Sequence, residues 1–176
     1  MIYFTADEHY GHKNIIRFCK RPFKNTQEMN LTIIKNHNSV VKDTDTVYHL
    51  GDFSFLSSHA TNEIITLLNG NHIFVQGSHD KPIKKLRPFI NQIEEIVIEK
   101  QIIVLCHYAM RTWSKSHYGS WQLYGHSHGT LPPIGKQWDV GVDNNDFSPR
   151  SFNDIKNIMQ ERDDNPNLVK KNDRKY

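Results

Sequence analysis

The chain has 176 residues and a formal net charge of +3 at pH 7, and 37% of its residues are hydrophobic. This length suits one soluble domain with a sizeable core. The last fifteen residues hold five basic and three acidic side chains, which leaves only +1 for the rest of the chain. Because that charge is too small for a broad nucleic-acid-binding face, we expect no stable complex with duplex nucleic acid.

The cysteines and the apolar runs indicate the compartment. Cys19 and Cys106 form no Cys-x-x-Cys pair and lie in apolar segments, which favours buried thiols in a reducing environment. A membrane-spanning helix needs about 18 consecutive apolar residues, and the sequence has no such run. These features predict a cytoplasmic protein without a membrane partner, and they leave its oligomeric state open.

Short apolar runs alternate with helical patterns along the chain. Strands are predicted over 2–5, 46–50, 72–76, 96–98, 102–106 and 121–124. Helices are predicted over 27–41, over 61–68, where Asn69-Gly70 stops the pattern, and over 151–160, starting near Ser151 or Asn153. This alternation indicates an α/β fold. We expect one domain over 1–161 and a polar, flexible tail over 162–176.

Histidine and aspartate residues follow directly on these predicted strands. The polar stretches are Asp7-Glu8-His9, Gly51-Asp52, Gly77-Ser78-His79-Asp80, His107 and Gly125-His126-Ser127-His128. Ligands of α/β sheets bind beyond the carboxyl ends of the strands, so these five loops are predicted to meet at one edge. The glycines at 51, 77 and 125 predict tight or positive-φ turns that aim the next side chain into a site.

Each motif is a weak signal alone, but the set favours a metal site. Asp7 and His9 project to the same side of an extended chain, but this pair alone is more typical of a surface turn, and His107 alone is more typical of a core histidine. The ligands are numerous enough for two ions bridged by a carboxylate. They are Asp7, His9, Asp52, His107, His126 and His128, with one more from the 77–80 loop. Mixed imidazole and carboxylate ligands favour Mn, Fe, Zn, Co or Ni.

The adjacent Ser78, His79 and Asp80 suggest a hydrolase triad, but neighbours on one chain rarely reach the geometry of that relay. Two metal ions about 3.5–4 Å apart are the usual apparatus of phosphoester hydrolysis and need no serine nucleophile. The leaving alkoxide still needs a proton or a positive charge beside it. His79, followed by Asp80, fits that role.

Taken together, the motifs resemble those of the calcineurin-like metallophosphoesterase superfamily in order and spacing. "DEHYGHKNIIRFCKRPF", "VYHLGDF" and "VGVDNNDFSP" resemble its small, stand-alone bacterial and phage-type members. The resemblance covers roughly residues 1–155 and implies a four-layer α-β-β-α sandwich with a dimetal site at the strand ends.

The resemblance also implies roles for individual residues. Asp7, His9 and His128 would bind the first ion, His107 and His126 the second, and Asp52 would bridge them. His79 would be the catalytic histidine near the leaving group, with Asp80 orienting it. At position 78 the family pattern has asparagine as a ligand of the second ion, so Ser78 either binds through a water or weakens that ion. Ala109 stands where proline is more usual.

The substrate is less well defined by the sequence. His12, Arg17 and Arg111 are candidate contacts to a phosphate, as are Arg21 and Lys115, although each is equally typical of a solvated charge. Trp113 and Trp121 can stack on a base, but buried packing is the better interpretation. The predicted substrate is a phosphorylated small molecule, a nucleotide or a short oligonucleotide.

Three functional hypotheses follow. The leading one is a phosphodiesterase or phosphatase that attacks its substrate with metal-bound hydroxide. Ser78 motivates the second, a catalytically weakened metal-binding scaffold or interaction module of the same fold. The third is a purely structural metal, which predicts that chelation unfolds the protein.

Overall fold

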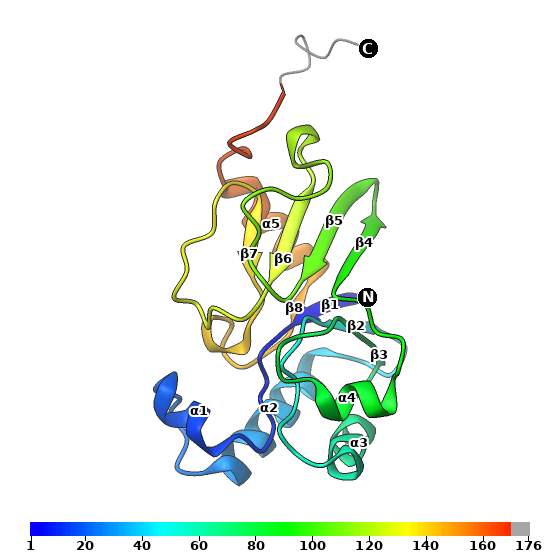
Figure 1. Cartoon of the computed structure of the whole chain (residues 1–176), viewed down its shortest axis with the longest axis vertical. Coiled ribbons are helices and arrows are strands. Elements are labelled where there is room, and N and C mark those ends of the chain that lie inside the picture. The colour runs from blue at the N-terminus through cyan, green and yellow to red at the C-terminus, as the bar shows by residue number, and fades with distance from the viewer. Residues whose placement is uncertain (170–176) are drawn as a thin grey trace.

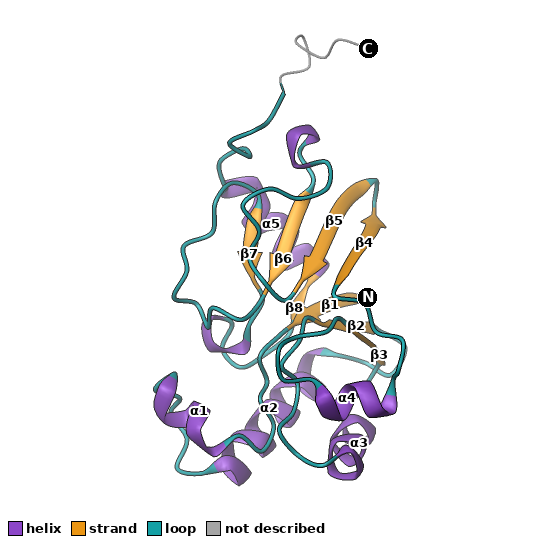
Figure 2. Ribbon diagram, viewed as in Figure 1, coloured by secondary structure: helices purple, strands orange, loops and turns teal. Residues whose placement is uncertain are grey.

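The computed structural model describes residues 1–169 and contains two four-stranded sheets (Figures 1 and 2). The first sheet has the order β3-β2-β1-β8 and comprises β1 (Ile2–Thr5), β2 (Thr46–His49), β3 (Asn71–Phe74) and β8 (Arg150–Ser151). The second has the order β4-β5-β6-β7 and comprises β4 (Ile93–Ile98), β5 (Gln101–Cys106), β6 (Trp121–Tyr124) and β7 (Gln137–Asp139). Within each sheet three strands are parallel, whereas β8 and β4 run antiparallel to their neighbours.

Five helices accompany these strands. They are α1 (Lys13–Phe18), α2 (Thr26–Val40), α3 (Ser58–Leu67), α4 (Lys81–Leu86) and α5 (Phe152–Glu161), with 3-10 turns η1 (Ser116–Tyr118) and η2 (Val142–Asn144). Side chains cap three of them: Asn25 accepts from Glu28 N, Ser57 from Ala60 N, and Ser151 forms a capping box with Asp154.

The predicted strands and helices are confirmed, and the mixed α/β class with them. The sequence missed α1 and α4, which have six residues each, and the short strands β7 and β8. Two turns of helix or two to three residues of strand give too little periodicity to detect.

The first sheet lies between α1 to α4 on one side and the second sheet on the other, as Figure 1 shows. Beneath the helices, one core contains Tyr10, Met29, Ile33, Phe53 and Phe74. Between the sheets, a second core contains Phe4, Leu50, Ile103, Leu105 and Leu123 together with Phe152, Ile155 and Met159 of α5. The second sheet thus receives one helix rather than a full layer, and α5 contacts β1 and β8 as well as β7.

The segment that follows α5 differs from the predicted flexible tail. Arg162 donates from Nε to Gly135 O at 2.7 Å, and Asn165 is only 3% exposed. Asn165 donates to Ser116 O at 2.8 Å and accepts from Lys136 N at 2.8 Å, so residues 162–169 pack against the loops of the second sheet. Residues 170–176 of the predicted tail lie outside the described residues.

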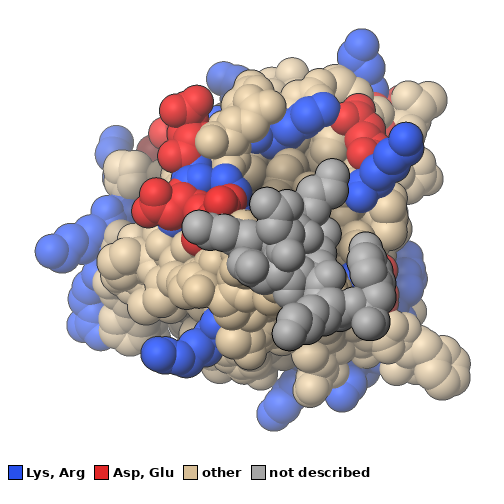
Figure 3. Space-filling view, turned by 90° about the horizontal axis from the view of Figure 1, so that it is seen from above, with Lys and Arg blue, Asp and Glu red and all other residues tan. Residues whose placement is uncertain are grey.

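The charged side chains are mixed in sign. On the face seen in Figure 3, several Lys and Arg side chains lie beside Asp and Glu side chains, as the small net charge predicts. Among residues 1–169, no helix is both long and apolar enough to cross a membrane.

Candidate metal centre

Two groups of potential metal ligands form where the strands of both sheets end. One group contains Asp7, His9 and His128, and the other Asp52, His107 and His126, with the ligand atoms of each group within 4.8 Å of one another. Asp7 and His9 follow β1, Asp52 follows β2, His107 follows β5, and His126 and His128 follow β6. The structure therefore brings together the six residues that the sequence singled out as ligands.

The two groups meet at the carboxylate of Asp52. Its Oδ2 lies 3.9 Å from His9 Nε2 and 3.5 Å from His107 Nε2, and His9 Nε2 is also 3.9 Å from Asp7 Oδ1. Two ligand atoms that bind the same ion, each at about 2.0–2.2 Å, lie about 3–4 Å from each other. The separations around Asp52 therefore suit cations held between the ligand atoms better than they suit direct hydrogen bonds. Asp52 is in the position of a bridging ligand.

Several atoms at this point are buried without a hydrogen-bond partner. They include Asp7 Oδ1, His9 Nε2 and His107 Nε2. Leaving a buried polar atom unpaired typically costs about 1–3 kcal/mol. Three such atoms close together therefore indicate a binding partner that satisfies them all. Divalent transition-metal ions fit, because imidazole nitrogen and carboxylate oxygen are their ligands.

The backbone at the candidate ligands is unusual. Asp7, His9, Asp52, His126 and His128 all have positive φ, between 47° and 67°, and only His107 of the six does not. Non-glycine residues rarely adopt this region, and such strain clusters at functional sites. The prediction that Asp7 and His9 lie on an extended chain is therefore wrong, because both residues after β1 adopt left-handed backbone.

The three glycines serve two different purposes. Gly51 has a φ of +93°, as predicted for a turn residue. At Gly77 and Gly125 φ is not positive, and a Cβ there would lie 2.5 Å from Asp52 Oδ1 and 2.6 Å from Asp7 Oδ2. Those two positions exclude a side chain because they press against the candidate ligand carboxylates.

Hydrogen bonds from neighbouring groups fix the orientation of the histidines. His107 Nδ1 lies 2.8 Å from Leu50 O, and His128 Nδ1 lies 2.6 Å from Asp143 Oδ2. A carbonyl can only accept, so His107 carries a proton on Nδ1, and in the neutral ring Nε2 then keeps a free lone pair. This arrangement is typical of metal-binding histidines.

Arg21 supports the same site from behind and does not reach a substrate. It is only 4% exposed and binds Asp143 through Nε and NH2, both at 2.7 Å. It also donates to the backbone carbonyls of Asp7 at 2.7 Å and Glu8 at 3.0 Å. The suggestion that Arg21 contacts a phosphate is therefore wrong. No sequence signal pointed to Asp143 beyond its place in the quoted motif.

The electrostatics of the protein side chains favour a cation. Burial raises the pKa of Asp7 well above its usual range and lowers that of His9. Burial also opposes ionisation of Asp52, but the nearby His107 imidazole and the hydrogen bond from the backbone N–H of His79 outweigh it and hold the pKa of Asp52 low. A divalent cation stabilises both a carboxylate and a neutral imidazole, so it relieves the cost of burying them.

The Ser78-His79-Asp80 stretch is not a catalytic triad. The Ser78 hydroxyl lies 3.0 Å from Asp52 Oδ2, and the backbone N–H of His79 donates to Asp52 Oδ1 at 2.7 Å. Asp80 is 2% exposed and accepts from the backbone N–H groups of Gly77, Asp52 and Phe53. Asp80 thus joins two metal loops, and the prediction that it orients the His79 ring is not what its hydrogen bonds show.

The remaining candidate residues divide by their surroundings. The His79 ring is exposed and lies 4.8 Å from that of Phe55, which stacks on His12 at 3.9 Å. Arg17 and Arg111 are exposed at the surface. His12 is thus at the site, whereas Lys115 pairs with Glu95 at 2.9 Å.

Trp113 and Trp121 are packed in the interior, as predicted. Trp113 is 8% exposed and donates from Nε1 to Ser120 O, and Trp121 is 9% exposed and lies against Phe152.

A buried chain of hydrogen bonds that the sequence did not predict lies behind the first metal loop. Glu8 Oε1 is 2.6 Å from His49 Nδ1, His49 Nε2 is 3.0 Å from His72 Nδ1, and His72 Nε2 is 3.3 Å from Leu68 O. If the rings are neutral, His72 donates from Nε2 to the carbonyl of Leu68 and so accepts at Nδ1 from the Nε2–H of His49. His49 then accepts at Nδ1, which leaves Glu8 as the donor. Burial raises the pKa of Glu8 to about 8 and lowers that of His49 to about 3, both consistent with this neutral pair.

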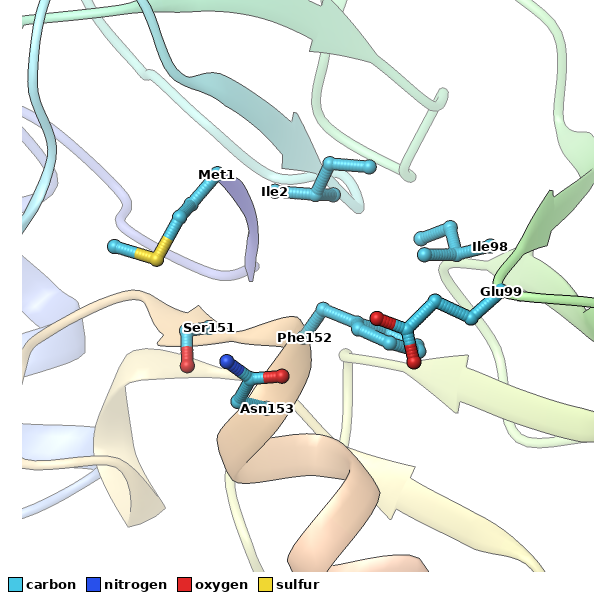
Figure 4. Close-up of a pocket in the computed structure, with 7 residues that line it drawn as sticks. All are labelled: Met1, Ile2, Ile98, Glu99, Ser151, Phe152 and Asn153. Carbon is cyan, nitrogen blue, oxygen red and sulfur yellow. The ribbon is translucent and has the colours of Figure 1, made fainter.

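Open space adjoins the metal ligands on two sides. A cleft of about 620 Å³ is lined by His126 and His128, and one of about 370 Å³ by Ser78 and Tyr108 among others. A third pocket, of about 230 Å³, is lined by residues including Ile2, Ile98 and Phe152 (Figure 4). It contains no candidate ligand and adjoins the start of β1, away from the strand ends that form the site.

The two sheets carry both ligand groups where their strands end, which is the arrangement expected from the resemblance to the calcineurin-like metallophosphoesterases. No family model matches the chain. The uncharacterized protein MJ1445 of Methanocaldococcus jannaschii is 35% identical over 170 residues, which cover 90% of this chain and 91% of that protein. The chain therefore belongs to the same family as MJ1445.

A solved structure shows the same fold. A protein of unknown function from Aquifex aeolicus, AQ665, matches with a TM-score of 0.73 and 26% identity over 90% of this chain and 98% of its own. A weaker likeness is to a predicted phosphoesterase of Streptococcus pneumoniae TIGR4, with a TM-score of 0.41 and 16% identity over 72% of this chain and 62% of that one. Another is to a single mutant of Vps29 from Entamoeba histolytica, with a TM-score of 0.46 and 18% identity over 80% of this chain and 72% of that one.

Proposed function

We propose that the protein is a phosphoesterase that depends on two divalent transition-metal ions. The observation that carries this proposal is the convergence of unpartnered, buried Asp7 Oδ1, His9 Nε2 and His107 Nε2 around the shared carboxylate of Asp52. Asp7, His9 and His128 would hold one ion, His107 and His126 the other, and Asp52 both. When bound, such a pair activates water near neutral pH and neutralises phosphate oxygens.

The chain's own residues supply the rest of the chemistry. His79 is exposed beside Phe55 at the rim of the site, where its imidazole can give a proton or positive charge to the leaving oxygen. Asp80 holds the loops of Asp52 and Gly77 together, which keeps the bridging carboxylate in place. Ser78 donates to Asp52 and so orients the carboxylate.

Hydrolysis of bis-p-nitrophenyl phosphate and p-nitrophenyl phosphate in Mn²⁺ tests the proposal, with chelator and with Asp52→Ala as controls. Metal-dependent turnover that the variant lacks is the expected result, and the preferred compound distinguishes diester from monoester chemistry. Turnover that survives in chelator, or equal turnover by Asp52→Ala, would overturn it.

A second candidate function is a weakened metal-binding scaffold, and Ser78 favours it. Its hydroxyl contacts Asp52, where an asparagine amide would be a ligand according to the resemblance. In Ser78→Asn, this candidate expects tighter binding of the second ion and faster turnover. If neither changes, the idea that Ser78 weakens the site loses its support.

A further inference from the structure

The cleft of about 620 Å³ beside the metal ligands is larger than a phosphate needs. Its lining includes His128 from one ligand group and His126 from the other, so it opens onto both candidate ion positions. Clefts of about 300–1,000 Å³ hold whole organic ligands. If the proposed phosphoesterase function holds, this space is available to the organic substituent of the phosphate.

An exposed aromatic ring lines this cleft. Phe18, the last residue of α1, is 62% exposed, and its ring meets that of His12 edge-on at 6.5 Å. His12 stacks on Phe55 at 3.9 Å, and Phe55 lies 4.8 Å from His79. A continuous row of rings thus leads from the cleft to the proposed catalytic histidine.

A strained lysine lines the same cleft. Lys20 follows the end of α1 with a φ of 52°, a place where helices usually have glycine. The lysine side chain is exposed, and no acidic side chain of residues 1–169 forms an ion pair with it. A positive charge is therefore available in the cleft for an anionic group.

The two hydroxyl groups that line the cleft already donate hydrogen bonds within the protein. Ser127 Oγ donates to Asp139 Oδ2, and Thr130 Oγ1 donates to Ser127 O, both at 2.6 Å. Recognition in the cleft then depends mainly on the face of an aromatic ring and on an ammonium group. A flat, conjugated ring attached to a phosphate matches both features.

We propose that this cleft binds the nucleobase of a nucleotide phosphoester, stacked on Phe18, with Lys20 beside its phosphate. The substrate class is then nucleotides or short oligonucleotides rather than sugar or lipid phosphates. Phe18 sets specificity, and it is not one of the metal ligands.

Calorimetric titration of the Mn²⁺-loaded protein with AMP and with ribose 5-phosphate tests the proposal, since the two differ only in the base. We expect AMP to bind at least tenfold more tightly, because stacking on an aromatic ring contributes about this much affinity. Phe18→Ala should abolish the difference. Phe89→Ala, which removes a 99% exposed ring outside the cleft, should retain it. Lys20→Met should weaken both ligands.

Equal affinity of the wild type for the two ligands, or an unchanged preference in Phe18→Ala, would overturn the nucleobase subsite. Unchanged affinities in Lys20→Met would show that Lys20 does not contact the ligand. Turnover of bis-p-nitrophenyl phosphate by the same preparations separates the two proposals. Turnover without an AMP preference rejects only the subsite, and an AMP preference without turnover rejects only the phosphoesterase.

Discussion

Two groups of histidines in this protein have opposite surroundings. His9, His107, His126 and His128 lie at the strand ends of the candidate metal centre. His37, His49 and His72 lie on the helical side of the first sheet, with ring centroids 5.1–6.2 Å apart.

The difference is in their hydrogen bonds. Two rings of the metal centre leave Nε2 buried and unpartnered, and three of its four histidines have positive φ. In the second group, His37 bonds Asn69 O, and both ring nitrogens of His49 and of His72 have partners. Burial alone therefore does not identify a ligand histidine. Each histidine of the metal centre has an unsatisfied buried ring nitrogen, a positive φ or both, and no histidine of the second group has either.

The largest effect is expected at the carboxylate that joins the two ligand groups. Asp52→Ala should release metal and lower phosphoester turnover by about a thousandfold or more, because both ions lose a ligand. Metal content and turnover are the measurements, with Asp43→Ala as an exposed control. Both hydrophobic cores exclude the ligands, so the variant and the chelated wild type should still unfold cooperatively. Retention of both ions would contradict the bridging role.

A smaller effect is expected from removing the ring of His79, which faces the solvent. His79→Ala should slow turnover by about 10²–10⁴-fold, the usual contribution of a general acid, with metal content unchanged. Comparison with His59→Ala, on an exposed face of α3, controls for the loss of any imidazole. If metal content falls together with turnover, His79 belongs to the metal centre and not to the leaving group.

The partner of His128 should affect metal affinity more moderately. Asp143→Asn keeps the size of the side chain but removes the charge that His128 and Arg21 contact. Loss of such an outer partner typically weakens metal binding by about 10–100-fold. Metal titration measures it, and exposed Asp146→Asn should bind as the wild type does. Equal affinities in all three proteins would show that Asp143 does not support the ligand.

The second histidine group should be visible only in the pH dependence of stability. Burial lowers the pKa of His37 to about 4, so the folded state keeps it neutral while the unfolded state takes up a proton below about 6.5. The contribution of His37 to the free energy of unfolding is present above pH 6.5 and is lost as the pH falls towards 4. Between these values the free energy of unfolding changes by about 1.4 kcal/mol per pH unit.

Denaturant unfolding in chelator between pH 4 and 7 measures this slope. His37→Gln should reduce it, whereas His59→Gln, whose ring is 86% exposed, should not. Glu8, His49 and His72 titrate nearby, with Glu8 acting in the opposite direction, so the difference between variant and wild type is the quantity to compare. An identical slope in His37→Gln would show that the pKa of His37 is the same in the folded and unfolded states.

The sequence predicted the parts of the fold that have a strong local signal. Apolar runs of three to five residues predicted β1 to β6, and the 3.6-residue period predicted α2, α3 and α5. Short elements such as α1 and β8 depend on their neighbours for stability, so their own residues carry little pattern. The sequence also did not predict the hydrogen bonds from Asn165 to the carbonyls of Ser116 and Ser120, because a polar segment has no residue pattern that indicates such distant contacts.

By itself, the sequence determined which residues end the strands, and hence that Asp7, His9, Asp52, His107, His126 and His128 gather at one edge. This followed because parallel strands share the direction of their carboxyl ends. Tertiary structure alone decided that Asp52 lies between the two groups, that Asp80 holds loops instead of His79, and that Arg21 is buried behind the site. Those contacts join residues far apart in the chain through single hydrogen bonds, and no local periodicity records them.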